Sequence, residues 1–286
     1  MTSHRNQIRI RNRSQSSRSE ICWSVYSLVR PLRRTPTPPG EKMLHEVLMV
    51  LVIVVGVAEI AIPVSHWWRS RVRARLVKDL FPLSEQRRLI IICPSQSSAA
   101  DSPNVATTHE DGLALAALLG KCVEHGIAHS VKLHTQVTDD DKAQDLFLIC
   151  GPGGNTVTKQ LFGTPSVGMA FHFVESSRGW NIVGNDEQPV HPTVDGRDRD
   201  YAILARVRNP WARPSHPTFV YLAAGIYGLG TWGATYYMAN DAPSLAAHLR
   251  TGVGNFGSET RFAAVVEVCR QGVSSPIVRL QKAVEQ

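Results

Sequence analysis

The sequence predicts an α/β protein with a Rossmann-like, mainly parallel sheet, helices on both faces, an inserted antiparallel β element and one preceding N-terminal transmembrane helix. Three observations lead to this fold class. From residue 88 onwards, apolar runs typical of buried strands alternate with helical segments, which is the pattern of a covered parallel sheet. Short strands bounded by Gly, Asn and Asp interrupt that series. A long apolar run precedes all of it.

Residues 1–42 combine Arg, Ser and Pro without apolar periodicity, so they are predicted to be a disordered basic segment, unless translation begins at Met43. The chain has a net charge of +7, and 16 of its 31 Lys and Arg residues lie within residues 1–88. A basic N-terminal segment followed by a domain of nearly balanced charge indicates an anionic partner surface. We expect membrane lipids in that role and no specific nucleic acid binding.

Residues 43–68 are predicted to be a transmembrane anchor. From Val47 to Val64 the run VLMVLVIVVGVAEIAIPV holds 18 residues with Glu59 as its only charge, which is just long enough to span a bilayer core. Trp67 and Trp68 follow, as in interfacial anchors. A cleaved signal peptide and a buried soluble helix are the two alternatives.

Residues 69–86, with an Arg cluster at their start, are predicted to be a basic juxtamembrane helix or linker. The cluster after the span is denser than the one before it, so we expect a single-pass protein whose main domain, residues 87–286, is cytoplasmic. The five cysteines form no C-x-x-C pair, which fits a reducing compartment.

The elements of residues 87–286 follow from periodicity and turn residues. Strands are expected at 88–93, 130–137, 145–150, 218–225 and 261–269; helices at 110–126, after Asn155, at 231–241, at 243–249 and from Pro276; and the inserted antiparallel strands at 169–174, 179–184 and 200–207.

The stretch GIYGLGTWGAT, residues 225–235, has the G-x-G-x-x-G spacing of a dinucleotide-binding turn at Gly228, Gly230 and Gly233, and it follows an apolar strand. No acidic residue stands at the distance where a ribose-binding acid is expected. We therefore expect a strand–turn–helix unit, with Thr231 beside its glycines, that is not a standard NAD site. Its aromatic residues either stack on a base or fill the core.

Two further loops follow buried strands, where open parallel sheets bind ligands. PSQSS places Ser95 and Ser97 after the strand at 88–93, and GPGGNT follows the strand at 145–150. The glycines of the second loop allow close backbone approach, and its polar residues cap the next helix, so the loop is a candidate anion site; the alternative is an ordinary turn. Its candidate binding residues are Gly151, Gly153, Gly154, Asn155 and Thr156.

Other polar groups give weaker signals. His109 and Glu110 open a helix and are candidates for acid–base chemistry, although helix capping explains Glu110 equally well. Asp195, Asp198 and Asp200 have metal-compatible spacing but lack the rest of a calcium loop, so no metal site is expected. Residues 209–217 form a proline-rich loop that either covers the site as a lid or simply connects strands.

These features favour a membrane-anchored cytoplasmic domain that binds a nucleotide or a similar anionic small molecule and acts as a sensor or regulator. A nucleotide-processing enzyme on the same scaffold and a non-catalytic membrane scaffold are the alternatives, because fold alone does not define function. The sequence contains no G-x-S-x-G, H-E-x-x-H or P-loop motif and identifies no cofactor.

Overall fold

The computed structural model describes residues 87–97, 105–106, 108–177, 179–190, 198–253, 257, 259–271 and 275–285. The predicted disordered segment 1–42, anchor 43–68 and juxtamembrane segment 69–86 lie outside these ranges. Within the described ranges, no helix has both the length and the apolar character that a membrane span requires.

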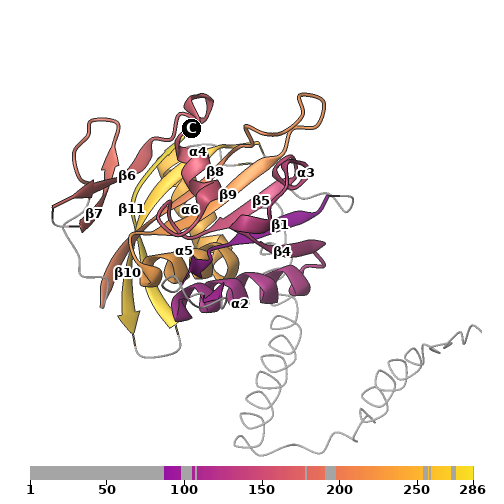
Figure 1. Ribbon diagram of the computed structural model, residues 1–286. Coiled ribbons are helices and arrows are strands. Elements are labelled where there is room, and N and C mark those ends of the chain that lie inside the picture. Colours follow the sequence, from indigo (N-terminus) through magenta and orange to yellow (C-terminus); the bar gives the residue numbers. More distant parts are fainter. Residues whose placement is uncertain are drawn as a thin grey trace, which may run out of the picture. The chain divides into compact units, whose positions relative to one another are not determined.

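A seven-stranded mixed sheet forms the centre of the fold (Figure 1). Its strands, in spatial order, are β11 (Ser275–Glu285), β10 (Phe262–Gln271), β8 (Arg199–Arg208), β9 (Phe219–Gly225), β5 (Asp145–Ile149), β1 (Leu89–Cys93) and β4 (His129–Leu133). The pairs β4–β1, β1–β5 and β5–β9 are parallel, whereas β9–β8, β8–β10 and β10–β11 are antiparallel. The α/β class is confirmed, but only half of the sheet is parallel, so it resembles a Rossmann-like sheet only loosely.

Helices pack on both faces of this sheet. Three helices bury apolar residues against one face: α2 (His109–Glu124), α5 (Gly228–Asn240) and α6 (Ala242–Val253). The other face is covered by α4 (Thr156–Phe162) and by a separate antiparallel hairpin of β6 (Phe171–Ser176) and β7 (Gly179–Gly184). The short elements are β2 (Gln96–Ser97), β3 (Val105–Ala106), η2 (His134–Gln136), α3 (Asp139–Lys142) and η3 (Pro165–Val167).

The structure corrects three expected elements. The strand expected at 130–137 is β4, which ends at Leu133, and residues 134–136 form η2 instead. Residues 275–285 form the edge strand β11, not a helix; Pro276 is tolerated because it lies near the start of an edge strand. Residues 200–207 were expected in the inserted β element, but they belong to β8, which lies inside the main sheet and is buried at its eight central positions. Burial at consecutive positions is typical of a strand that is covered on both faces. The antiparallel insertion consists of β6 and β7 alone.

Helix α5 lies against β10 at Gly233. A Cβ at that position would be 2.2 Å from Cγ1 of Val268, so only glycine lets the helix come this close to the strand. The last glycine of the G-x-G-x-x-G spacing therefore serves helix–sheet packing, and the helix begins at Gly228, earlier than expected.

We predict that Gly233→Ala lowers the free energy of unfolding of the full chain by about 1–3 kcal/mol, because its methyl group overpacks the contact with Val268. In the double variant with Val268→Ala, the loss of unfolding free energy should be about 1 kcal/mol smaller than the sum of the losses in the two single variants. Denaturant titration measures both effects. The control is Gly120→Ala, where an added Cβ meets no atom within 4 Å and is expected to be neutral or slightly stabilising. Additive effects of Gly233→Ala and Val268→Ala would contradict the packing role.

Candidate functional site

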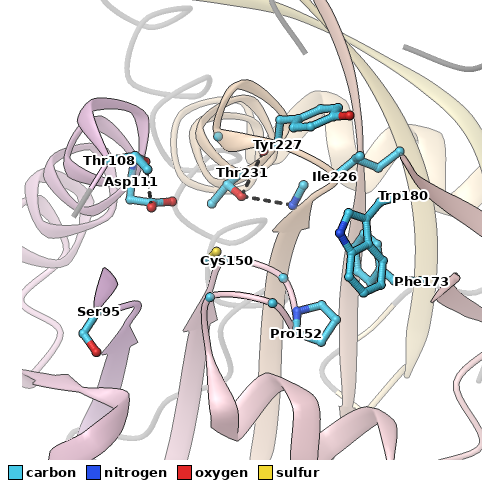
Figure 2. A pocket seen from close by; sticks show the side chains of 15 residues that line it. Ser95, Thr108, Asp111, Cys150, Pro152, Phe173, Trp180, Ile226, Tyr227 and Thr231 are labelled. Atoms are coloured by element: carbon cyan, nitrogen blue, oxygen red, sulfur yellow. Dashed lines mark hydrogen bonds between the residues drawn. The ribbon is translucent and has the colours of Figure 1, made fainter. Parts of the chain in front are cut away.

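The carboxyl ends of β1, β5 and β9 surround a cavity of about 570 Å³ (Figure 2). Along the chain, β1 is followed by β4 on one side and then by β5 on the other, so the strand order reverses between β1 and β5. Ligands in open α/β sheets bind at such a switch point. The described residues that line the cavity are Ser95, Thr108, Asp111, Cys150, Gly151, Pro152, Gly153, Gly154, Phe173, Trp180, Gly225, Ile226, Tyr227, Gly228 and Thr231.

Asp111, in the first turn of α2, presents a buried carboxyl group to this cavity. Thr108 caps the helix: its Oγ1 accepts from the Asp111 N–H at 3.1 Å and donates to Asp111 Oδ2 at 2.7 Å. The other carboxyl oxygen, Oδ1, has no hydrogen-bond partner among the described residues, although Asp111 is only 4% exposed. Burial raises the pKa of Asp111, and the bonds from Thr108 oppose that shift. A buried acceptor without a partner is costly, so Oδ1 is a position for a ligand's donor group.

The glycine loop after β5 forms the floor of the cavity. Asn155, 1% exposed, donates from Nδ2 to the carbonyl oxygens of Ile92 (3.3 Å) and Ile149 (3.0 Å), and its Oδ1 accepts from the N–H groups of Val157 and Thr158. The two N–H groups at the start of α4 are therefore already satisfied by the protein. Gly153, in contrast, is exposed, and an added Cβ there would meet no atom within 4 Å.

Cys150 connects β5 to this loop in a left-handed backbone conformation, with φ of 81°. Such a conformation is unfavourable for a residue with a Cβ and often marks a functional position. A Cβ on Gly154 would lie 2.8 Å from Cys150 Sγ, so glycine at 154 makes room for the thiol. Burial, followed by the nearby Asp111 carboxylate, raises the pKa of the Cys150 thiol to about 12. Cys150 is therefore a neutral thiol at neutral pH.

The start of α5 contains an anion that belongs to the protein itself. The carboxylate of Asp200, which is fully buried, accepts from the N–H groups of Tyr227 (3.0 Å) and Gly230 (2.6 Å) through Oδ2, and from the Tyr201 N–H through Oδ1. A Cβ on Gly230 would come within 2.7 Å of Asp200 Oδ2. The glycine spacing in this turn thus admits an internal carboxylate at a helix N-terminus, where a phosphate would bind in a dinucleotide site.

Aromatic side chains form the wall of the cavity opposite α2. Figure 2 shows Phe173 and Trp180, from β6 and β7, on the far side of the glycine loop from Asp111. Phe173 and Trp180 are half-buried, and Tyr227 is exposed at the start of α5. One side of the cavity therefore offers aromatic faces and the other offers a carboxyl oxygen.

Ser95, after β1, belongs to a chain of three side chains. Its Oγ lies 2.7 Å from Nε2 of His134, and Nδ1 of His134 lies 2.9 Å from Oγ1 of Thr156. Ser95 lines the cavity, whereas His134 and Thr156 are not among its lining residues. The three residues follow the carboxyl ends of β1, β4 and β5, which are adjacent strands.

The structure brings six of the sequence-predicted residues into the cavity lining: Ser95, Gly151, Gly153, Gly154, Gly228 and Thr231. Asn155 is buried and Thr156 is exposed, and neither is a lining residue, while Gly230 and Gly233 lie inside the packed helix α5. Ser97 lies in β2 and pairs through its backbone with Val105.

The other sequence candidates do not belong to this site. Glu110 forms an ion pair with Arg270 at 3.0 Å, and His109 is exposed. Asp200 serves the α5 turn, Asp198 is exposed, Asp195 lies outside the described residues, and no metal-binding cluster occurs in the described ranges. The loop 209–217 is not a lid: Asn209 binds the carbonyl oxygens of Lys142 and Gln144, just before β5, at the opposite end of that strand from the cavity.

Sequence reasoning missed Asp111, Cys150, Phe173, Trp180 and His134. The capping pattern Thr108-x-x-Asp111 before an apolar run was a usable signal for the first of these. The others are assembled by the tertiary fold.

These features define an α/β protein with a ligand-sized cavity at the switch point of a mixed sheet. In comparisons with known proteins, no protein-family model, no curated protein and no solved structure matches the chain.

We predict a pH-dependent contribution from Asp200. Burial is the largest influence on this carboxyl group and raises its pKa to about 6, while the bonds from Gly230, Tyr201 and Tyr227 oppose the rise. The folded chain therefore holds this proton more tightly than the unfolded chain, so the stabilisation is present at low pH and is lost as pH rises from about 4 through 6. Between pH 4 and pH 7 the loss should approach about 3 kcal/mol.

Urea titrations of wild type and of Asp200→Asn across this pH range test the prediction, because the amide removes the titrating group. The difference in unfolding free energy between the two should change with pH in the stated direction. Asp198→Asn, at an exposed position, is the matched control and should track wild type. A difference between wild type and Asp200→Asn that is constant with pH would contradict the burial effect.

Proposed function

We propose that residues 87–286 bind a small molecule that carries a planar ring, of the nucleotide class, in the cavity at the ends of β1, β5 and β9. We propose further that residues 43–68 hold this domain at a membrane, facing the cytoplasm, where it acts as a sensor or regulator. The observation that carries the binding proposal is that Oδ1 of Asp111 has no partner among the residues that the structure describes, in a cavity with aromatic side chains on its opposite wall.

The chemistry of the lining supports a ring with donor groups. A volume of about 570 Å³ is within the range of small-molecule sites. Trp180 and Phe173 present ring faces on which a base can stack, and stacking on an aromatic side chain contributes about 1–3 kcal/mol per base. A ring N–H or amino group satisfies Asp111 Oδ1, which removes the penalty of a buried acceptor without a partner.

Charge limits how much an anionic group adds to the affinity. Among the described residues of the lining there is no Lys, Arg or His, and Asp111 contributes negative charge. Asn155 occupies the Val157 and Thr158 N–H groups that were expected to bind an anion. We therefore propose that the ring provides most of the affinity, and that a phosphate, if the ligand has one, contacts the exposed loop at Gly153.

We predict that adenosine or guanosine binds the full chain with nearly the affinity of its monophosphate, within about threefold, because none of the described lining residues has a cationic side chain. Trp180→Ala should weaken binding about 5- to 100-fold through loss of stacking, whereas Trp180→Phe should retain most of it. Calorimetric titration with four compounds, the two nucleosides and their two monophosphates, measures these differences.

A steric variant checks the position of the ligand. Gly153→Val places a side chain in open space at the cavity and should block binding without loss of stability, while Gly120→Val, on α2 and away from the cavity, should bind as wild type does. The binding proposal fails if none of the four compounds binds, or if Gly153→Val leaves the affinity unchanged.

Membrane attachment is tested separately. We predict that the full chain stays in the membrane pellet after carbonate and high-salt washes, because its 18-residue apolar run would lie in the hydrocarbon core. Release by either wash would leave only electrostatic attachment through the Arg cluster. Protease added to intact cells should leave the body uncut, and digestion from outside would reverse the proposed orientation.

A further inference from the structure

We propose that the protein is an esterase in which Ser95 is the nucleophile, His134 is the general base and Thr156 is the positioning residue that orients the imidazole. The inference uses the same cavity as the proposed binding function and adds a reaction to it. Its substrate class is a carboxylic ester with an aromatic or other planar part, because Phe173 and Trp180 form one wall of that cavity.

The geometry has the three parts that an activated serine requires. Ser95 Oγ is within hydrogen-bonding distance of His134 Nε2 at 2.7 Å, and the second ring nitrogen lies 2.9 Å from Thr156 Oγ1. A nucleophile, a base in contact with it and a third group that orients the base are the recognisable pattern of covalent catalysis. Thr156 replaces the carboxylate of the familiar serine triads, and it can accept a hydrogen bond from Nδ1–H.

This chain of contacts is fixed by the sheet. Ser95 lies two residues beyond β1, His134 begins η2 directly after β4, and Thr156 is the first residue of α4. Because β4, β1 and β5 are adjacent and parallel, their carboxyl ends meet at one edge. Ser95 and His134 are 39 residues apart in sequence, and His134 and Thr156 are 22 residues apart, so the three side chains come together only through this topology.

Catalysis requires one of the two tautomers that these contacts allow. We assign the proton to Nδ1, which then donates to Thr156 Oγ1 and leaves Nε2 free to accept from the Ser95 hydroxyl. Nε2 lies 3.5 Å from the Ser95 carbonyl oxygen, farther than from the hydroxyl oxygen. The base is thus directed at the nucleophilic oxygen.

The reaction proceeds in two balanced steps. Ser95 Oγ attacks the ester carbonyl carbon, its proton moves to His134 Nε2, and the carbonyl π electrons move to the oxygen. The C–O bond to the alcohol then breaks, and the alcohol leaves with the proton from Nε2. Water attacks the resulting acyl-serine in the same way, His134 returns a proton to Ser95 Oγ, and the carboxylic acid is released.

The glycine loop lies beside the nucleophile. A Cβ on Gly154 would be 3.6 Å from Cβ of Pro94, the residue before Ser95, so loop and nucleophile are neighbours. At Gly153 the absence of a side chain leaves the backbone open to the cavity, where an N–H group can stabilise the negative carbonyl oxygen. Cys150 is a poorer nucleophile here, since burial keeps its thiol protonated with a pKa of about 12.

A fluorophosphonate probe tests the proposal on the full chain in membranes. Its phosphorus forms a bond to an activated serine oxygen, fluoride leaves, and the serine proton passes to the base. We expect one covalent label on Ser95, identified by peptide mass spectrometry, and none in Ser95→Ala. Ser166→Ala, at an exposed position in η3, is the matched control and should label as wild type does.

Variants of His134 and Thr156 distinguish a role of these residues in catalysis from a purely structural role. His134→Ala should slow labelling at least about 100-fold, and added imidazole should partly restore it, which a merely structural histidine would not allow. Thr156→Val should slow labelling about tenfold, and Thr156→Ser, which keeps the hydroxyl, should restore it. Unchanged thermal unfolding of each variant shows that the fold is intact.

The outcomes separate this proposal from nucleoside binding. No label on wild type, a label on another serine, or equal rates for wild type and His134→Ala would overturn the esterase. In those cases, nucleoside binding that persists in Ser95→Ala leaves the binding proposal standing. A label on Ser95 that depends on His134, without binding of any of the four compounds, would reject the nucleotide class and keep the esterase.

Discussion

The buried side chain of Asn155 is the interaction on which the geometry of the site depends. Its amide group donates to the carbonyl oxygens at the ends of β1 and β5, and its oxygen caps the first turn of α4. Both ends of the amide are used, and a buried amide that loses any of these partners leaves polar groups unsatisfied. One side chain therefore links the carboxyl ends of β1 and β5 at the switch point to the start of α4.

Asp200 has the corresponding role at the start of α5. A strand–glycine turn–helix unit exposes N–H groups that attract a negative charge, whether that charge comes from a nucleotide or from the chain. Here the carboxylate arrives from β8, which is antiparallel to β9 and passes close to the turn. The glycines of the G-x-G-x-x-G spacing thus allow two close approaches to the helix. A carboxylate approaches it at Gly230, and a strand approaches it at Gly233.

Much of the fold could be predicted from sequence, because apolar runs such as those of β1, β5 and β9 permit few other structures. The C-terminal strand was harder: a proline followed by mixed residues is also typical of a helix start, and only the pairing with β10 decides. The loops around the cavity were predictable as strand ends with glycine and serine. His134 was not, since its partners are distant in sequence, and Trp180 and Phe173 look like ordinary strand residues until the hairpin packs over the cavity.

The hairpin of β6 and β7 has an evolutionary consequence. Its backbone hydrogen bonds close within a two-stranded sheet of its own, apart from the central sheet, and yet it supplies the aromatic wall of the cavity. Substitutions, insertions or replacement of this hairpin can alter what the cavity recognises while the strand register and the polar groups at the strand ends stay as they are. The polar side chains of the cavity thus lie on the loops and helices around the central sheet, and Phe173 and Trp180 lie on the hairpin, so ligand preference can be altered through the hairpin without a new fold.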